Sequence, residues 1–237
     1  MRRFNSFAEV TAIVAVLCLA LGRTQSSAAV KAVSTDGEAT VYVTGDLSRN
    51  FNVSYQAALH PSPGNRSWTT VGVMLLGRAN PGPSLEVGLA RGPSNALTGF
   101  TSTQGVKPRA TFKAFVVRCT PGCVLTVRAD ENAYYASIEG AQVGEWPRKQ
   151  FDFIKPYIQL NAEVIKPGDS ISAVFLPIRL VSNSEPMQSP SCAFTTRGIE
   201  PSLLPNGALQ FVGTYRRDAP PAFVSLGTRH HGDRCEK

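Results

Sequence analysis

Short runs of β-forming residues, separated by clusters of Pro, Gly, Asn and Asp, constrain the fold of this chain more than any other feature. Residues 157–165 alternate apolar and polar side chains, as a strand with one buried face does. Residues 70–76 form a more continuous apolar run, which indicates a buried strand. Turn clusters such as 167–169 recur every 10 to 15 residues or so. This rhythm predicts an all-β fold, an antiparallel β-sandwich or jelly roll.

The expected strands cover most of the chain, and no window after the amino-terminal leader sustains an apolar helical period. Residues 182–207 differ, because they are rich in Ser, Pro and Asn, and we interpret them as a long connection or a lid. The strands are predicted at residues 39–44, 51–57, 70–76, 84–91, 111–118, 124–128, 133–139, 142–146, 157–165 and 170–180, with weaker ones at 209–215 and 222–226.

The amino terminus has the layout of a secretory signal peptide. Arg2 and Arg3 precede an apolar run at residues 11–22, and small residues follow at Ser26 and Ala28. The run is shorter than the roughly 20 residues that a bilayer span needs. We therefore predict cleavage after Ala28 and a secreted, soluble mature chain without membrane insertion. The alternative is a signal anchor that stays in the membrane.

The mature chain is predicted to hold a β-sandwich domain at residues 29–181. Residues 182–237 are then a Ser/Pro-rich connection with C-terminal strands and a tail, packed on or beside the sandwich. Cleavage removes three arginines and one glutamate, so the net charge falls from +7 to +5. The remaining basic residues are scattered and form no stripe, which argues against a nucleic-acid partner.

Four cysteines remain after cleavage: Cys119, Cys123, Cys192 and Cys235. An even count in an exported chain indicates two disulfides. Cys119 and Cys123 flank a Pro-Gly turn between two apolar runs, and a tight hairpin there would bring them within disulfide range. We therefore favour Cys119–Cys123, which leaves Cys192–Cys235 to hold the tail.

Metal binding is an alternative use of these residues. The cysteines with His230 and His231 could bind zinc, but export favours oxidation and the spacing matches no zinc module. A loop that begins at Asp130 (Asp-Glu-Asn) could bind calcium through oxygen ligands, although an ordinary polar turn is the simpler interpretation. We predict no bound cofactor, with calcium near Asp130 as the alternative.

Residues 124–146 (VLTVRADENAYYASIEGAQVGEW) read as a three-stranded meander, and residues 68–91 read as two strands around a Pro-Gly turn. With these segments, residues 39–180 resemble a concanavalin A-like or laminin-G-like β-sandwich. Glu139 stands where this family usually has Asp or Asn before the last strand. The Glu-x-Asp-x-Glu set of the family's hydrolases is absent. The resemblance therefore implies glycan binding more than glycan cleavage.

No catalytic residue is assigned from the sequence. Glycoside hydrolysis needs two carboxylates across one cleft. The acidic residues expected on strands are Glu86, Glu139, Glu145 and Glu163, and no two of them share a strand two positions apart. We interpret them as solvent-facing. The Gly-x-Ser-x-Gly elbow of serine hydrolases is also missing.

Four aromatic residues are candidates for stacking against sugar rings: Trp68, Tyr134, Tyr135 and Trp146. Tyr134 and Tyr135 are neighbours on an expected strand, so they point to opposite faces and only one can serve a binding face. We predict a secreted, non-catalytic protein that binds carbohydrate or a surface polymer. The alternatives are a secreted glycan hydrolase with dispersed carboxylates and a structural or cell-surface protein with no small ligand.

Two glycosylation sequons occur, at Asn52 and at Asn65. Asn65 follows a Pro-Gly pair in an expected loop, whereas Asn52 is expected within a strand. Asn65 is therefore the better predicted acceptor if the chain meets the glycosylation machinery.

Overall fold

The computed structural model describes residues 37–43, 47–77, 83–105, 111–151, 153, 155–182 and 192–226. All of them belong to a compact unit of residues 35–237, which is distinct from residues 1–34. The described residues form fifteen strands and one 3-10 turn, Arg148–Gln150, with no α-helix. The predicted all-β class is therefore confirmed, and no described helix could cross a membrane.

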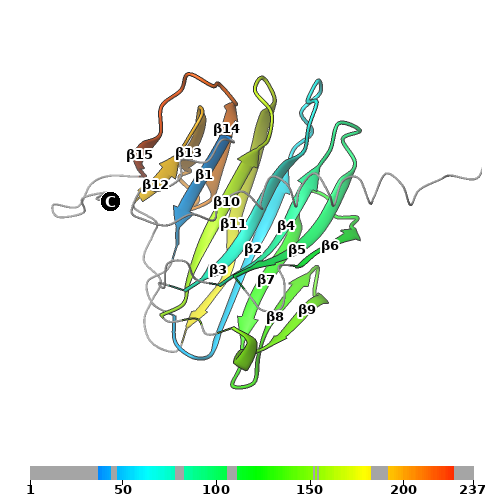
Figure 1. The fold of residues 1–237 in the computed structure, drawn as a ribbon, viewed down its shortest axis with the longest axis vertical. Helices are drawn as coiled ribbons and strands as arrows, with labels where there is room; N and C mark the ends of the chain where they lie inside the picture. Colours follow the sequence, from blue (N-terminus) through cyan, green and yellow to red (C-terminus); the bar gives the residue numbers. More distant parts are fainter. Residues whose placement is uncertain are drawn as a thin grey trace, which may run out of the picture. The chain divides into compact units, whose positions relative to one another are not determined.

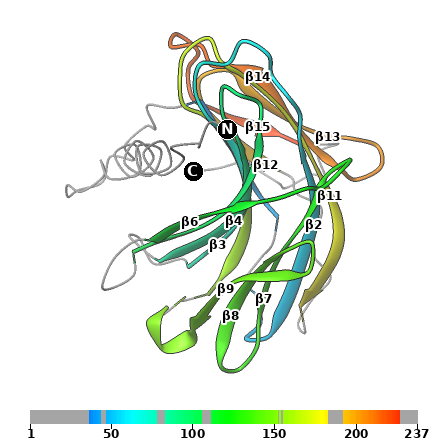
Figure 2. The same cartoon turned by 90° about the vertical axis from the view of Figure 1, so that its right-hand side faces the viewer.

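The strands form two antiparallel sheets, which Figures 1 and 2 show as separate layers. Sheet A has the order β15 (Ala222–Ser225), β12 (Cys192–Thr195), β1 (Gly37–Tyr42), β10 (Tyr157–Val164), β3 (Thr69–Leu76), β4 (Ser84–Arg91), β5 (Leu97–Gln104) and β6 (Thr111–Val116). Sheet B has the order β13 (Ile199–Leu203), β14 (Leu209–Thr214), β11 (Ser170–Ser182), β2 (Phe51–Leu59), β7 (Cys123–Ala129), β8 (Ala133–Ile138) and β9 (Ala141–Pro147). The predicted β-sandwich is thus confirmed.

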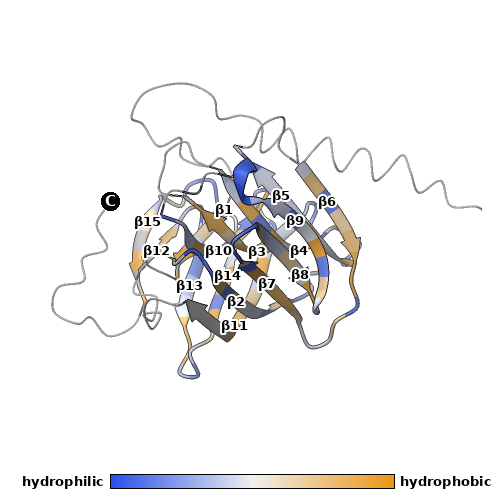
Figure 3. Ribbon diagram, turned by 90° about the horizontal axis from the view of Figure 1, so that it is seen from below, coloured by the Kyte–Doolittle hydropathy of each residue, from blue (hydrophilic) through white to orange (hydrophobic). Residues whose placement is uncertain are grey.

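The hydrophobic core lies between the two sheets. Alternate residues of each central strand point inward, as in β10, where Ile158, Leu160 and Ala162 are fully buried. Figure 3 shows apolar and polar residues along the strands of both sheets. Phe175 of β11 packs edge-on against Tyr55 of β2 and Phe211 of β14, with ring centroids 6.2 and 5.7 Å apart. Such packing favours one sheet register, because a slip of one residue would move these rings out of the core.

The C-terminal strands are hydrogen-bonded members of both sheets. Strand β12 pairs with β1, and β15 pairs with β12, so both extend sheet A. Strands β13 and β14 extend sheet B through the pairing of β14 with β11. The weak strands expected at residues 209–215 and 222–226 therefore correspond to β14 and β15. The boundary at residue 181 stays a prediction.

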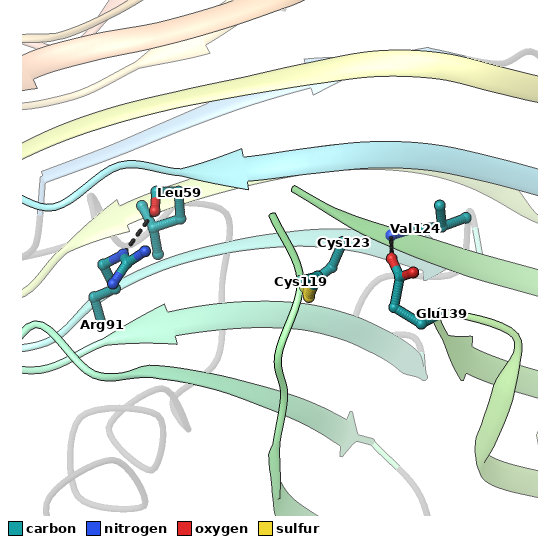
Figure 4. Close-up of a disulfide and its surroundings, with 6 residues drawn as sticks. All are labelled: Leu59, Arg91, Cys119, Cys123, Val124 and Glu139. Atoms are coloured by element: carbon teal, nitrogen blue, oxygen red, sulfur yellow. Dashed lines mark hydrogen bonds between the residues drawn. A yellow bond between two sulfur atoms is a disulfide. The ribbon is translucent and has the colours of Figure 1, made fainter. Parts of the chain in front are cut away.

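Cys119 and Cys123 are joined by a disulfide, with their Cα atoms 5.2 Å apart, as the sequence favoured. The expected hairpin around them is wrong, because β6 lies in sheet A and β7 in sheet B. The cysteines therefore sit at a crossover between the sheets. Figure 4 shows Glu139 beside this crossover, where its carboxylate accepts the backbone N–H of Val124. The Cys192–Cys235 pairing lies outside the described residues.

A hydrogen bond from a side chain makes a second connection between the sheets, and Figure 4 shows it. The Arg91 guanidinium of β4 donates its Nε–H to the carbonyl oxygen of Leu59 on β2, at 2.6 Å. The same guanidinium donates to the carbonyl oxygen of Asn95. Arg91 thus joins the end of a sheet A strand to the end of a sheet B strand.

The buried carboxylate of Asp169 fastens two crossovers between the sheets together. It is 1% exposed and accepts the backbone N–H groups of Arg66 and Ser67, at 2.9 and 2.7 Å, and the Ser67 hydroxyl. Arg66 and Ser67 lie between β2 and β3, and Asp169 lies between β10 and β11. Burial alone would raise the pKa of Asp169, but the hydrogen bonds from Ser67 and Arg66 hold it below its usual value.

Asn65 reinforces this connection, which its sequon did not indicate. Its amide nitrogen donates to the carbonyl oxygen of Ser170 at 2.7 Å, and its amide oxygen accepts the N–H of Ser170 at 2.8 Å. The side chain that would carry a glycan is therefore engaged with the backbone. Asn52 is half-buried in β2, as its expected place within a strand implied. Glycosylation at both sites stays a prediction.

We expect Asp169→Asn to lower the free energy of unfolding at neutral pH by about 2 kcal/mol, because a buried acceptor of three hydrogen bonds becomes an amide. The pKa of Asp169 is lower in the folded state than in the unfolded chain, so its stabilisation is present above the unfolded pKa. The stabilisation is lost as pH falls below that value. Urea unfolding of both proteins across this range measures the effect.

The matched control is Asp218→Asn, because Asp218 is exposed in a turn. We expect it to leave stability nearly unchanged. An equal loss in both variants, or a loss from Asp169→Asn that does not shrink in acid, would contradict the role assigned to Asp169.

Candidate functional site

A group of polar side chains is buried on the outer face of sheet A, which points away from the core. Glu86 of β4, Gln159 and Asn161 of β10 and Ser102 of β5 are 9, 7, 7 and 6% exposed. Their neighbours in sequence, such as Leu85 and Leu160, point inward and are fully buried. Polar side chains on an outer face are ordinarily solvated, so their burial marks this part of the sheet as a candidate site.

The strand registers bring these residues into two adjacent rows. One row runs from Gln159 through Met74 and Glu86 to Ser102. The adjacent row places Gly72 opposite Asn161 on one side and opposite Gly88 on the other. Two glycines in one row leave open space on the face above β3 and β4.

The space above Gly72 is filled by the carboxyl group of Glu86. A Cβ atom at Gly72 would overlap Oε1 of Glu86, and it would lie 2.8 Å from the Glu86 Cγ atom. Because Gly72 is the register partner of Asn161, the Glu86 carboxyl leans across β3 toward Asn161. Gly72 is therefore the position that allows a side chain of β4 to reach one of β10.

The space above Gly88 is filled by an aromatic ring. A Cβ atom at Gly88 would lie 2.6 Å from the ring of Phe100. Phe100 also stacks on Phe112 of β6, with centroids 5.6 Å apart. This aromatic pair forms an apolar border on the β5–β6 side of the polar group and helps to exclude water from it.

Burial raises the pKa of Glu86 from 4.5 to about 7. Hydrogen bonding from Asn161 opposes this shift, the negative charge of Glu38 adds to it, and Ser102 opposes it. Glu38 lies on β1, where it is the register partner of Glu163 on β10. Glu86 is thus a carboxyl group that holds or releases its proton near neutral pH.

Two oxygen atoms of the group have no hydrogen-bond partner, Oε1 of Glu86 and Oδ1 of Asn161. A buried acceptor without a donor costs about 1 to 3 kcal/mol, so such atoms are uncommon away from functional sites. A protonated Glu86 would supply one donor to the group. A bound molecule with N–H or O–H groups would supply others.

The aromatic candidates do not form one surface. Tyr134 is buried and packs edge-on against Phe153, with centroids 4.9 Å apart. Trp146 is the register partner of Tyr134 and lies half-buried over Gly144. The two therefore share one face of sheet B.

The other two aromatic candidates lie elsewhere. Tyr135 faces the opposite side of β8, where the guanidinium of Arg128 sits 3.8 Å from its ring centroid. Trp68 precedes β3 of sheet A and is half-buried, and a Cβ atom at Gly92 would lie 2.9 Å from its ring. A continuous aromatic strip is therefore not found within the described ranges, and sugar stacking by these four residues stays a prediction.

The carboxylate of Asp130 organises a turn. It accepts the N–H groups of Asn132 and Ala133 at 2.9 and 3.1 Å and faces Arg128 at 3.7 Å. The backbone hydrogen bond from Asn132 contributes most to lowering its pKa. The Asp130 carboxylate thus stabilises the turn before β8, and calcium binding near Asp130 stays a prediction.

One group with the composition of a metal site occurs in the described part of the chain, Cys119, Cys123 and Glu139. Its two sulfur atoms are bonded to each other, so they are not the thiolates that zinc requires. Cys235, His230 and His231 lie outside the described residues, as does the side chain of Cys192.

Sequence reasoning named Glu86 but interpreted it as solvent-facing, and that interpretation is wrong. The strand pattern correctly placed Glu86 opposite Leu85 and Val87, on the face away from the core. It carried no sign that Glu86 is buried on this face, or that Gly72 and Asn161 lie beside it. A single signal existed, because Gly72 and Gly88 both interrupt apolar strands, and glycine in a strand often marks a close approach.

No family model matches the chain, and no curated protein matches it either. Solved structures with a similar fold do exist. They include scytalido-glutamic peptidase bound to a peptide-based transition-state analogue, with a TM-score of 0.52 and 10% identity. SCP-B, described as an Eqolisin-family peptidase in complex with a tripeptide, matches with a TM-score of 0.50 and 12% identity. Each match covers 76% of this chain and 98% of the other.

Other matches are looser, among them a non-specific endo-β-1,3(4)-glucanase of glycoside hydrolase family 16. Its TM-score is 0.40 at 9% identity, over 51% of this chain and 49% of that one. The β-sandwich resemblance expected from the sequence is confirmed at the level of fold. At these identities the comparisons establish the β-sandwich fold of this chain.

We expect the stability of Glu86→Gln, compared with that of the wild type at the same pH, to be higher in alkali than in acid. The folded pKa is raised, so the wild type is favoured below the unfolded pKa and loses stability as pH rises toward about 7. The amide that replaces the carboxyl group has the same shape and does not ionise. The free energy of unfolding of the variant, relative to that of the wild type, should therefore rise by about 3 kcal/mol between acid and alkali. Urea unfolding at several pH values measures the difference.

Glu131→Gln is the control, because Glu131 is exposed in the turn between β7 and β8. It should give a stability difference from the wild type that hardly changes with pH. If Glu86→Gln behaves like this control, Glu86 is not a buried acid.

Proposed function

We propose that this chain is a hydrolase that cleaves peptide bonds, with Glu86 as its general acid. The observation that carries the proposal is the buried Glu86 carboxyl, whose Oε1 atom lacks a partner and whose pKa is raised by burial to about 7. An effective general acid has a pKa near the working pH, because it must hold a proton and still release it. Such shifts concentrate at functional sites.

The neighbouring side chains suit the remaining steps of amide hydrolysis. The carboxamides of Asn161 and Gln159 lie on the same face of β10 and carry N–H donors. Donors of this kind stabilise the negative charge that develops on a carbonyl oxygen under attack by water. Glu86 would then protonate the leaving nitrogen as the carbon–nitrogen bond breaks, and the resulting carboxylate would take up the proton that the attacking water loses. The burial of Glu86 and the Phe100–Phe112 pair would limit access of bulk water.

A peptide is the favoured substrate because the peptidases with this fold match almost along their whole length. Two of the comparison structures are described as complexes with a peptide-based analogue and with a tripeptide. In this chain, the Glu86 carboxyl lies over Gly72 and the Phe100 ring lies over Gly88, so a peptide on the outer face of sheet A would contact these two groups.

The carbohydrate ligand expected from the sequence is the second candidate, and a β-sandwich suits it. One observation favours it, since the rings of Trp68 and Trp146 are only half-buried and leave part of their surface for a ligand. We also propose that the chain is secreted, because residues 1–28 have the layout of a signal peptide. The oxidising conditions outside the cytosol would favour the Cys119–Cys123 disulfide.

We expect the purified protein to cleave members of a peptide library detected by mass spectrometry. Glu86→Gln should reduce the rate roughly a hundredfold or more, because the acid is replaced by an amide that donates no proton to the leaving group. The wild-type rate should fall as pH rises above about 7, where the Glu86 carboxyl loses its proton.

Glu131→Gln again serves as the control and should keep the wild-type rate, since Glu131 is exposed in a turn of sheet B. Equal cleavage by the wild type and Glu86→Gln would reject Glu86 as the acid. If no peptide is cleaved at any pH and a glycan array shows specific binding, the carbohydrate-binding function replaces this proposal.

A further inference from the structure

A cavity of about 340 Å³ lies away from Glu86, on the side of the sandwich where β2 and β10 begin and β9 ends. Its volume falls in the range of small-ligand sites. Its lining combines apolar or aromatic side chains with two cationic ones, Arg49 just before β2 and Arg148 on the 3-10 turn after β9. The main lining residues are Leu47, Tyr134, Arg148, Phe151, Phe153 and Pro156.

Of these two cations Arg49 is exposed, whereas Arg148 is half-buried and its position is fixed by neutral acceptors. It donates to the carbonyl oxygens of Asp130 and Arg49 and to the hydroxyl oxygen of Tyr134. Its guanidinium also lies 4.7 Å from the centroid of the Tyr134 ring. In the part of the chain that the structure describes, no carboxylate pairs with Arg148; the Asp130 carboxylate faces Arg128 instead.

This arrangement leaves the positive charge of Arg148 and some of its N–H groups available to a ligand. A guanidinium carries five N–H groups, and three of those on Arg148 have protein acceptors. A half-buried cation that has no carboxylate partner among the described residues is unfavourable, and an arriving carboxylate would relieve that cost. The rings of Phe151 and Phe153, stacked 5.5 Å apart, offer an apolar wall beside the guanidinium.

We propose that this cavity is a binding site for a small organic carboxylate with an apolar body. The carboxylate accepts the remaining N–H groups of Arg148, and the apolar part lies against Leu47 and Phe151. Tyr134, a ligand-binding candidate from the sequence, contributes to the site by holding Arg148 in place.

The chain contains its own reporter for this site. Trp146 packs edge-on against Phe151, with ring centroids 6.4 Å apart, and the chain has one other tryptophan, Trp68. Trp68→Phe leaves Trp146 as the sole indole. Its fluorescence should respond when a ligand contacts Phe151.

The test titrates the Trp68→Phe protein with phenylacetate and with phenylacetamide, which share a shape but differ in charge. We expect a saturable change of Trp146 fluorescence with phenylacetate and binding at least about tenfold weaker with the amide. Arg148→Met in the same background should remove this preference. Lys113→Met, at an exposed position of β6, should keep it.

Melting curves show whether Arg148→Met still folds; if it does not, the acid-to-amide comparison in the Trp68→Phe protein decides. Equal affinity for the acid and the amide would overturn the proposal. So would the absence of a saturable response to phenylacetate, or a response to glucose that equals it and indicates a sugar site. None of these results depends on Glu86 or on peptide cleavage.

Discussion

The register of β10, β3 and β4 determines what the outer face of sheet A contains. Glu86 faces away from the core because β4 alternates, and it leans over β3 because the residue there is Gly72. A shift of one residue in either pairing would turn Glu86 toward the core or set it against a side chain. The buried carboxyl is therefore a consequence of strand pairing, and that pairing depends on the packing between the sheets.

The sheets are joined by contacts that keep this register. Asp169 and Asn65 fasten the β2–β3 and β10–β11 crossovers to each other at one end of the sandwich. These crossovers lead directly into β3 and out of β10, the two strands that carry Gly72 and Asn161. Arg91 adds a link from the end of β4 to β2. The candidate site thus lies on strands whose ends are held by buried polar contacts, which limits their movement.

Much of the fold follows from local pattern, whereas the site does not. Alternation in residues 157–165 and turn residues at 167–169 predicted β10 and the turn after it, because period and turn chemistry are local properties. The hairpin expected around Cys119 and Cys123 failed, since a short loop between two strands does not specify whether they share a sheet. Glu86 was misjudged for a related reason. Its burial depends on Gly72 and Asn161, which meet it only through pairing between strands distant in sequence.

The central claim is that Glu86 is a proton-holding acid near neutral pH. The most direct measurement is a carbon-13 NMR titration of the glutamate side-chain carboxyl groups, with Glu86→Gln used to assign the Glu86 signal. This account predicts that the assigned signal titrates near 7, far above the range of an exposed glutamate. A Glu86 signal that titrates near the ordinary glutamate value would contradict the burial of the carboxyl and the function proposed from it.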